Sequence, residues 1–151
     1  SKFYEAIILY SMEYDCTVPN GVVNLVEAQE RKATQDELKQ VMKQSNIVVH
    51  CANVEVEGMA CMEAFATGCV PVIAESPLSS TSAYALSPQN RFPAGNKQIL
   101  AQKIDYWITH PQDLKIMSSN YQNYAKSLSI ENSATKVLAM FEKAQKNYVS
   151  N

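Results

Sequence analysis

The sequence predicts an α/β domain with a doubly wound parallel sheet, because two apolar runs flank one short helical segment. The run IVVHCA (47–52) shows no polar alternation, which is typical of a parallel strand covered on both faces. The run CVPVIA (69–74) follows a helical segment from about 58 to 67, which Gly68 is suited to end. Together these pieces have the size of a βαβ unit, and folds built from such units bind ligands at the carboxyl ends of their strands.

The segment before this unit supplies further strands and one helix. The runs YEAIILY (4–10) and VVNLVEA (22–28) are strand candidates, separated by a loop with turn-favouring residues. A capping box from Thr34 to Glu37 opens a helix that extends to about Ser45. We therefore expect a small parallel sheet of about four to six strands with helices on its faces.

The C-terminal half predicts three helices. After residue 75 the chain is rich in Ser, Pro and Asn, and an apolar stripe then marks a helix over 97–109. Pro111 is suited to the first turn of the next helix, and the last helix runs from about Glu131 to Tyr148 as a helical C-terminal tail. The side chains that we expect to face inward from this last helix are Val137, Leu138, Phe141 and Ala144.

Composition limits the classes of function. The 151 residues are the length of a single domain, which we expect to span 1–151. The net charge is -2, with 13 basic and 15 acidic residues spread along the chain, so we expect no nucleic-acid partner. No apolar run approaches the ~18 residues of a membrane span, and the start lacks the order of a signal peptide, so we expect a cytoplasmic protein.

The cysteines and histidines do not predict a metal site. The four cysteines are Cys16, Cys51, Cys61 and Cys69. They form no Cys-x-x-Cys pair, and the last three lie in or beside the predicted core, where a reduced thiol behaves as a small hydrophobe. His50 and His110 are far apart and have no metal-like partner at helical spacing.

Two carboxylates flank the start of the predicted middle helix. Glu55 lies in the loop at the carboxyl edge of the sheet, and Glu63 follows eight residues later, about a turn and a half into the helix. Between them, the first helical amides around Gly58 would stabilise a phosphate or diphosphate. Because an ionised acid accepts protons from two hydroxyls at once, this order suits a ligand of the form sugar–diphosphate–ribose–base.

Spacing alone leaves a plainer interpretation open. In it, Glu63 is an ordinary, partly exposed helix residue, and Glu57 favours the helix start through the dipole. A single glycine is also a much weaker signal than a Gly-rich phosphate loop.

Residues 46–74, NIVVHCANVEVEGMACMEAFATGCVPVIA, resemble the signature of retaining GT-B glycosyltransferases of family GT4 (glycosyl transferases group 1), in their C-terminal donor-binding domain. The family pattern is a strand, a Glu, seven residues, a second Glu, a small-residue helix end with Gly, and an apolar strand near Pro-Val. Glu55 and Glu63 fall on the two acids. The remaining matches are Ala64, Ala66, Gly68, Pro71 and Val72.

The resemblance implies a Rossmann-like fold and a nucleotide-sugar donor, commonly linked to UDP or GDP. It makes Glu55 the catalytic residue, in contact with hydroxyls of the transferred sugar, and it places Glu63 on the ribose hydroxyls. It puts the base near the end of the second strand. The donor-binding residues that it implies are Leu25, Val26, Glu27, Glu55, Val56, Glu57, Gly58, Met59, Ala60 and Glu63.

The resemblance also implies what the whole enzyme does. It would be a hexosyltransferase that builds a polysaccharide or glycolipid, acting on a glycan or lipid acceptor without metal or cofactor. The acceptor-binding N-terminal domain is not in this chain, so the chain alone should be inactive. Peripheral association of the full-length enzyme with the inner face of the membrane is a further implication.

The sequence departs from the family pattern beside the first acid. Val56 and Glu57 stand where the family usually has Gly and an aromatic residue, and SMEYDCTVPNG replaces the usual Gly-rich turn after the first strand. Two other functions stay open on the sequence. One is a non-catalytic nucleotide-binding or regulatory α/β module, and the other is half of a nucleotide-sugar epimerase.

Overall fold

A five-stranded parallel sheet forms the centre of the molecule. The computed structural model describes residues 7–10, 22–24 and 35–149 of the chain. The strand order is β2-β1-β3-β5-β7, and each neighbouring pair is parallel, so the carboxyl ends of all five strands lie at one edge. The five strands are β1 (Ile7–Tyr10), β2 (Val22–Asn24), β3 (Ile47–His50), β5 (Val70–Glu75) and β7 (Arg91–Pro93).

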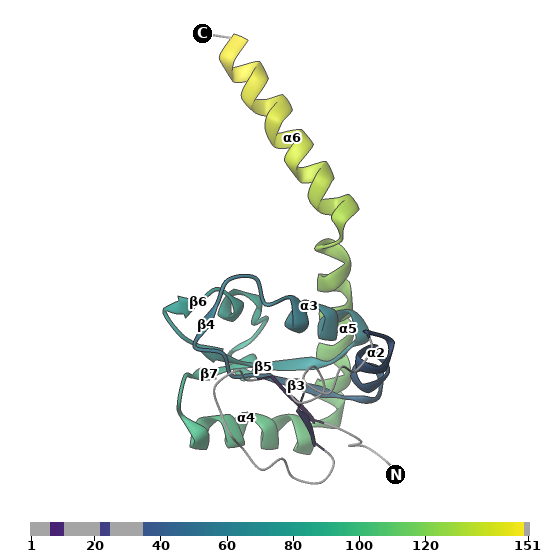
Figure 1. Ribbon diagram of the computed structural model, residues 1–151, viewed down its shortest axis with the longest axis vertical. Coiled ribbons are helices and arrows are strands. Elements are labelled where there is room, and N and C mark those ends of the chain that lie inside the picture. The colour runs from purple at the N-terminus through teal and green to yellow at the C-terminus, as the bar shows by residue number, and fades with distance from the viewer. Residues whose placement is uncertain (1–6, 11–21, 25–34, 150–151) are drawn as a thin grey trace.

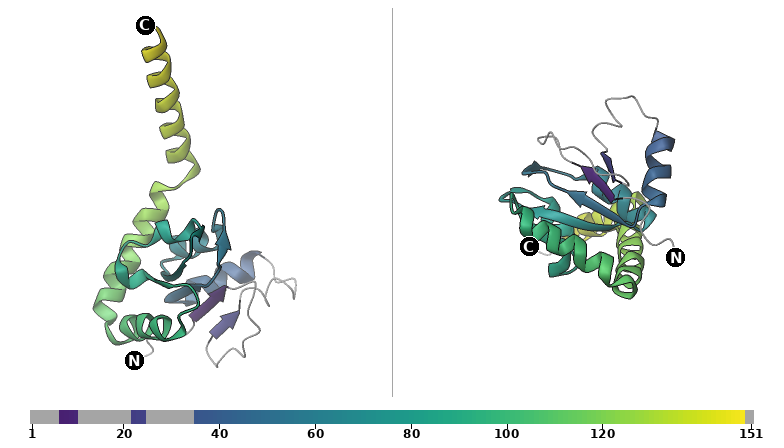
Figure 2. Two further views of the ribbon diagram at one scale, coloured as in Figure 1. Left: turned by 90° about the vertical axis from the view of Figure 1, so that its left-hand side faces the viewer. Right: turned by 90° about the horizontal axis from the view of Figure 1, so that it is seen from below.

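Helices cover both faces of this sheet. Figure 1 shows α3 on one face, together with a small two-stranded ribbon of β4 and β6, and α4 on the other. Seen from below, α4 lies in front of the strands (Figure 2). The helices are α2 (Gln35–Gln44), α3 (Met59–Thr67), α4 (Lys97–Thr109), α5 (Pro111–Ser127) and α6 (Ile130–Val149), with short 3-10 turns η1 (Thr81–Tyr84) and η2 (Pro88–Asn90).

The predicted βαβ unit is confirmed. All four side chains of β3 are buried, and β3 pairs with β5 in parallel register from Ile47↔Val70 to His50↔Ile73. Ile47 and Val49 join the core cluster around Phe65, Trp107 and Tyr121, whereas Val48 packs with Met42, Ala64 and Cys69. Since alternate side chains of a strand point to opposite faces, these two clusters explain why the run lacks polar alternation.

Three short strands escaped the sequence prediction. They are β4 (Val54–Glu55), β6 (Leu78–Ser79) and β7 (Arg91–Pro93), all of which lie in segments that the sequence favours as loops. Two or three residues are too few to show a period of two, so only the pairing partner reveals them as strands. Thr34 of the predicted capping box, and residues 25–28 of the predicted second strand, lie outside the described residues.

Glycine ends α3, as the sequence predicts. Gly68 adopts φ 94°, in the left-handed region, and its amide donates to the Phe65 carbonyl at 3.0 Å. The Cys69 amide donates to the Ala64 carbonyl at 3.1 Å, and the Ser118 hydroxyl on α5 donates to the Gly68 carbonyl at 2.7 Å. These bonds occupy the last carbonyls of α3 and turn the chain directly into β5.

The prediction that the last helix packs inward is wrong. Figure 1 shows α6 standing clear of the sheet beyond the end of α5. The four side chains predicted to face inward are all exposed, with Leu138 at 63% and Phe141 at 62%. An apolar stripe indicates which side of a helix favours burial, but it carries no information about the surface that buries it.

The exposure of α6 leads to a test on Phe141. We expect Phe141→Ser to change the free energy of unfolding of this chain by less than about 0.5 kcal/mol, because the ring is exposed and the two residues have similar helix propensity. Urea denaturation followed by circular dichroism measures the change. A loss of about 2 kcal/mol or more would mean that Phe141 is buried in solution.

Candidate functional site

Glu55 lies on a short strand just beyond the carboxyl edge of the sheet. β4 pairs in parallel with β6 through Glu55↔Ser79, and the Glu55 side chain keeps 24% of its surface exposed. Oε1 of this carboxylate accepts from the amides of Val56 at 3.0 Å and Glu57 at 3.3 Å. Oε2 lies 3.8 Å from Nε2 of His50, the last residue of β3. One oxygen of the carboxylate is thus held by backbone amides, the other lies close to His50, and part of the group faces solvent.

The backbone of the Glu55 loop is held by the segment that follows β6. The Ser80 amide donates to the Glu55 carbonyl at 2.9 Å, and the Ser80 hydroxyl donates to the Val56 carbonyl. The Tyr84 hydroxyl donates to the Glu57 carbonyl at 2.8 Å. Val56 and Glu57, the two departures from the family pattern, therefore contribute bonded carbonyls while their side chains are exposed.

Gly58 brings the chain from this loop into α3. It adopts φ 62°, and its carbonyl accepts from the amides of Cys61 at 3.0 Å and Met62 at 3.1 Å. The amides of Met59 and Ala60 precede these first intrahelical bonds and lie at the positive end of the helix dipole. Gly58 is buried, whereas Met59 is 55% exposed and Ala60 is partly exposed, so the helix start reaches the surface at these two residues.

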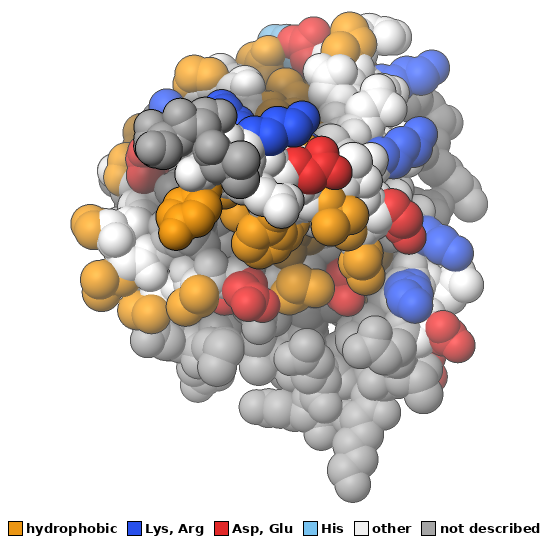
Figure 3. Space-filling view, turned by 90° about the horizontal axis from the view of Figure 1, so that it is seen from above, with side chains coloured by type: hydrophobic (Ala, Val, Ile, Leu, Met, Phe, Trp, Pro, Cys, Tyr) orange, Lys and Arg blue, Asp and Glu red, His pale blue; other side chains and the backbone are white. Residues whose placement is uncertain are grey.

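Glu63 lies exposed on α3, one turn after Met59 and on the same side of the helix. Glu55, the helix start and Glu63 thus follow one another along the segment that leads from β4 through α3. Leu25, Val26 and Glu27, which the resemblance assigns to the nucleotide base, lie outside the described residues. Figure 3 shows hydrophobic side chains over the end that carries β4 and β6, where Val54, Val56 and Leu78 are exposed.

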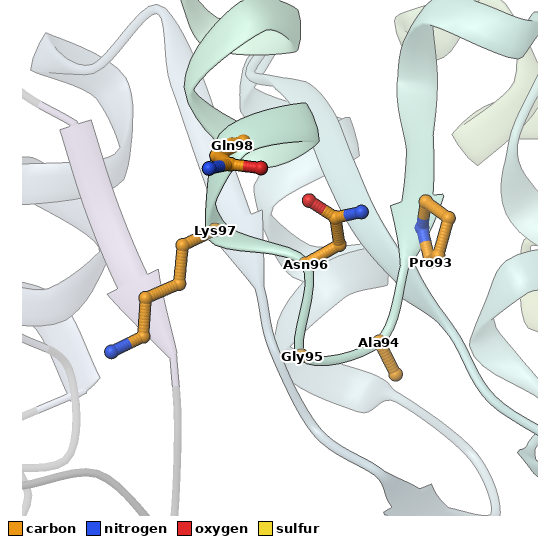
Figure 4. A pocket seen from close by; sticks show the side chains of 6 residues that line it. All are labelled: Pro93, Ala94, Gly95, Asn96, Lys97 and Gln98. Atoms are coloured by element: carbon orange, nitrogen blue, oxygen red, sulfur yellow. The ribbon is translucent and has the colours of Figure 1, made fainter.

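Two surface pockets lie away from these acids. One of about 610 Å³ is lined by residues 93–98, at the turn from β7 into α4, where the Asn96 side chain accepts from the Ile99 amide at 3.0 Å (Figure 4). The other, of about 380 Å³, is lined by residues of α3 and α5 that include Ala66 and Lys126. The first shares the carboxyl edge of the sheet but lies on the α4 side, so it adds a hollow that the sequence did not predict.

His50 is a neighbour of the acid loop that sequence reasoning missed, whereas for Ser80 and Tyr84 the sequence left two interpretations open. His50 ends a buried run without polar alternation, which favours treating it as a core residue, and the structure buries it to 1% exposure. Ser80 and Tyr84 belong to the segment SPLSSTSAYAL (76–86), whose serines could either add contacts at the same edge of the sheet or form a solvated loop. Only the parallel pairing of β4 with β6 brings that segment against Glu55.

Burial lowers the pKa of His50 below its usual 6.5, and the nearby Glu55 carboxylate partly opposes this shift. Between the lowered value and 6.5, the unfolded chain binds a proton that the folded chain does not. The free energy of unfolding therefore receives the full contribution of this group above pH 6.5, and this contribution is lost as the pH falls from 6.5 to the lowered pKa.

We expect a fall from about pH 7.5 to about pH 5.5 to reduce the free energy of unfolding less in His50→Gln than in wild type. Urea denaturation at several pH values measures this, with His110→Gln as the control because His110 is exposed. Equal pH dependence in wild type and His50→Gln would contradict the burial of a neutral imidazole.

Two of the described cysteines are buried thiols in the core. Cys61 and Cys69 are buried and Cys51 is partly exposed, while Cys16 lies outside the described residues. Burial raises the pKa of both the Cys61 and the Cys69 thiols, so both stay protonated at neutral pH. Within the described ranges, no group of three or more potential ligand residues is arranged to hold a metal ion, and no helix is long and apolar enough to cross a membrane.

Comparison with known proteins identifies the family. Residues 25–127 match the model of the glycosyl transferases group 1, and the chain belongs to this family. Among solved structures, the chain is similar to the catalytic domain of cholesterol-alpha-glucosyltransferase from Helicobacter pylori, with 26% identity and a TM-score of 0.68 over 83% of this chain and 99% of that one. No curated protein sequence matches the chain significantly. The fold is accordingly a Rossmann-like parallel α/β fold, like that of GT-B catalytic domains, with a helical C-terminal tail.

Proposed function

We propose that the chain is the donor-binding domain of a retaining glycosyltransferase of family GT4, which transfers a hexose from a nucleoside-diphosphate sugar. The observation that carries this proposal is the Glu55 carboxylate, held by the amides of Val56 and Glu57 beside the open start of α3. A carboxylate oriented in this way accepts hydrogen bonds from sugar hydroxyls, while helix-start amides stabilise the charge of a diphosphate.

Each part of the donor then has a place at the site. The transferred sugar lies against Glu55, the diphosphate against the amides from Gly58 to Ala60, and the ribose hydroxyls against Glu63. The base, uracil or guanine, lies near Leu25, Val26 and Glu27. Positioning of the donor and stabilisation of the departing diphosphate supply the catalysis, without metal or cofactor.

The acceptor is a glycan or a lipid, and a separate acceptor-binding domain completes the active site, so the chain alone is inactive. The similar solved structure belongs to an enzyme that, by its name, glucosylates cholesterol, which supports a lipid acceptor here. A lipid acceptor would bring the whole enzyme to the cytoplasmic face of a membrane.

Binding of nucleotide sugars tests the donor site. Isothermal titration with UDP-glucose, GDP-mannose and ADP-glucose, and with the matching nucleoside diphosphates, identifies the donor. We expect Glu63→Gln to weaken both the nucleotide and the nucleotide sugar, and Glu55→Gln to weaken only the nucleotide sugar, each by roughly 10-fold or more. Glu142→Gln, on exposed α6, serves as the matched control.

Two outcomes would contradict the proposal. Undiminished binding of the nucleotide sugar by both variants would mean that the acids do not contact the ligand and would favour a regulatory module. Binding of no nucleotide or nucleotide sugar by wild type would remove the donor site altogether. For the complete enzyme, NMR of the product distinguishes retention of the anomeric configuration from inversion.

A further inference from the structure

We infer that His50 is a positioning residue for Glu55: it holds one oxygen of this carboxylate in the orientation that receives the transferred sugar. The inference rests on the proposed function and deepens it, since it assigns a role at the sugar site to a buried residue of β3. The inference is based on the proximity of His50, the buried last residue of β3, to Glu55 on the two-residue strand β4.

The two oxygens of Glu55 have different partners. Oε1 accepts from the amides of Val56 and Glu57, which belong to the same loop and move with it. Oε2 lies 3.8 Å from Nε2 of His50, which is 1% exposed. His50 pairs in register with Ile73 of β5, in the interior of the sheet. His50 therefore lies between the Glu55 side chain and the core of the sheet.

A contact with the core is important for a carboxylate on a strand of only two residues. Glu55 has 24% of its side chain exposed, so a second contact, beside the two amides on Oε1, narrows the range of orientations open to Oε2. With its proton on Nε2, the imidazole would donate to Oε2 once the two atoms approach, and it would leave the other lone pairs of that oxygen to sugar hydroxyls. At 3.8 Å the two atoms are close neighbours but lie beyond hydrogen-bond distance, so Oε2 must move toward Nε2 by a few tenths of an ångström to accept from it.

The charges around His50 favour a neutral donor. Among the described residues, the Glu55 carboxylate on β4 lies 3.8 Å from the ring, and the Cys61 thiol on α3 is buried and stays protonated. Because burial lowers the pKa of His50, the imidazole is neutral at pH 7 and above. It then orients Glu55 without cancelling the negative charge that makes the carboxylate a strong acceptor.

The first test separates positioning from folding. We compare wild type, His50→Leu, which fills the space without a donor, and His50→Gln, whose amide nitrogen replaces Nε2. The probes are UDP-glucose, GDP-mannose and ADP-glucose with their nucleoside diphosphates, measured by titration calorimetry. We expect His50→Leu to bind the nucleotide sugar about 5- to 10-fold more weakly, with unchanged affinity for the nucleoside diphosphate, and His50→Gln to retain most of the affinity.

The pattern of losses decides the outcome. Equal losses for the nucleotide and the nucleotide sugar in His50→Leu would show a merely structural role and overturn the inference, as would no loss at all. If wild type binds none of the probes, the proposed function fails, and the inferred role toward a sugar fails with it. Binding by wild type with no selective effect of His50→Leu leaves the proposed function intact and overturns only the inference.

The second test needs no ligand and does not depend on His50→Leu folding. The chain has two histidines, so His110→Gln leaves His50 as the one imidazole to follow by NMR through a pH titration. Adding Glu55→Gln should lower the pKa of His50 further, because the carboxylate charge that opposes the burial effect is gone. An unchanged pKa would mean that the two side chains do not interact in solution, and would overturn the inference.

Discussion

Gly58→Ala is expected to lower the free energy of unfolding by about 2–4 kcal/mol, although it adds only one methyl group. Two costs combine at this position. The residue adopts φ 62°, which L side chains rarely adopt, and an added Cβ would lie 2.4 Å from the Thr81 Cγ2 atom. Thr81 is fully buried, and its hydroxyl shares a 2.7 Å hydrogen bond with Ser79, so the methyl group has little room to move.

A matched glycine separates these two costs. Gly95 also has positive φ, at 80°, but an added Cβ there would meet no atom within 4 Å. Gly95→Ala should therefore show only the backbone cost, about 1–2 kcal/mol, measured by urea denaturation beside Gly58→Ala. Thr81→Ser removes the clashing methyl and should restore part of the stability of Gly58→Ala. Equal losses at the two glycines would mean that the contact with Thr81 is relieved at no cost.

Phe65→Ala is expected to lower the free energy of unfolding by about 3–5 kcal/mol, because it leaves a cavity in the largest core cluster. Phe65 projects from α3 and is fully buried. Its ring centroid lies 4.8 Å from that of Tyr121 on α5 and 5.9 Å from that of Tyr84 in an edge-to-face contact. Phe65 thus joins α3 to α5 and to the η1 segment that holds the Glu55 loop.

The same substitution should affect the site. Loss of the Phe65 ring loosens Tyr84, whose hydroxyl bonds the Glu57 carbonyl, so we expect weaker nucleotide-sugar binding even under conditions where Phe65→Ala remains folded. Phe65→Leu is the control, because it keeps most of the volume and should cost clearly less than Phe65→Ala. Denaturation and calorimetry on both variants measure the two effects. A loss in Phe65→Ala no greater than in Phe65→Leu would contradict the role assigned to the aromatic cluster.

The local sequence predicts much of the candidate site because its parts are close in the chain. Glu55, Gly58 and Glu63 lie within nine residues of one another, and the helix between them has a predictable start and end. Helical geometry alone then puts Glu63 one turn beyond the open amides. The spacing of these residues therefore predicts that the acid, the helix start and the second acid follow one another after a parallel strand. The residue pattern predicts the group 1 family.

The contacts that shape the loop were not available in this way. Ser80 and Tyr84 lie about 25 residues from the carbonyls that they bond, and the pairing of β4 with β6 that brings them there involves two residues on each strand. His50 reads as one more member of a buried run, and its approach to Glu55 depends on how the chain turns between β3 and β4.

The sequence by itself determined the parallel βαβ unit, the helix boundaries around Gly68 and Pro111, and the family, because periodicity and end signals act over a few residues. Only the tertiary structure decided that Ser80 and Tyr84 bond the Glu55 loop and that the apolar side chains of α6 are exposed. The stripe predicts that one face favours burial, yet Phe141 and Leu138 are exposed because α6 leaves the domain after α5. Burial requires a partner surface, and the partner of a helix face is set by the path of the whole chain rather than by the residues on that face.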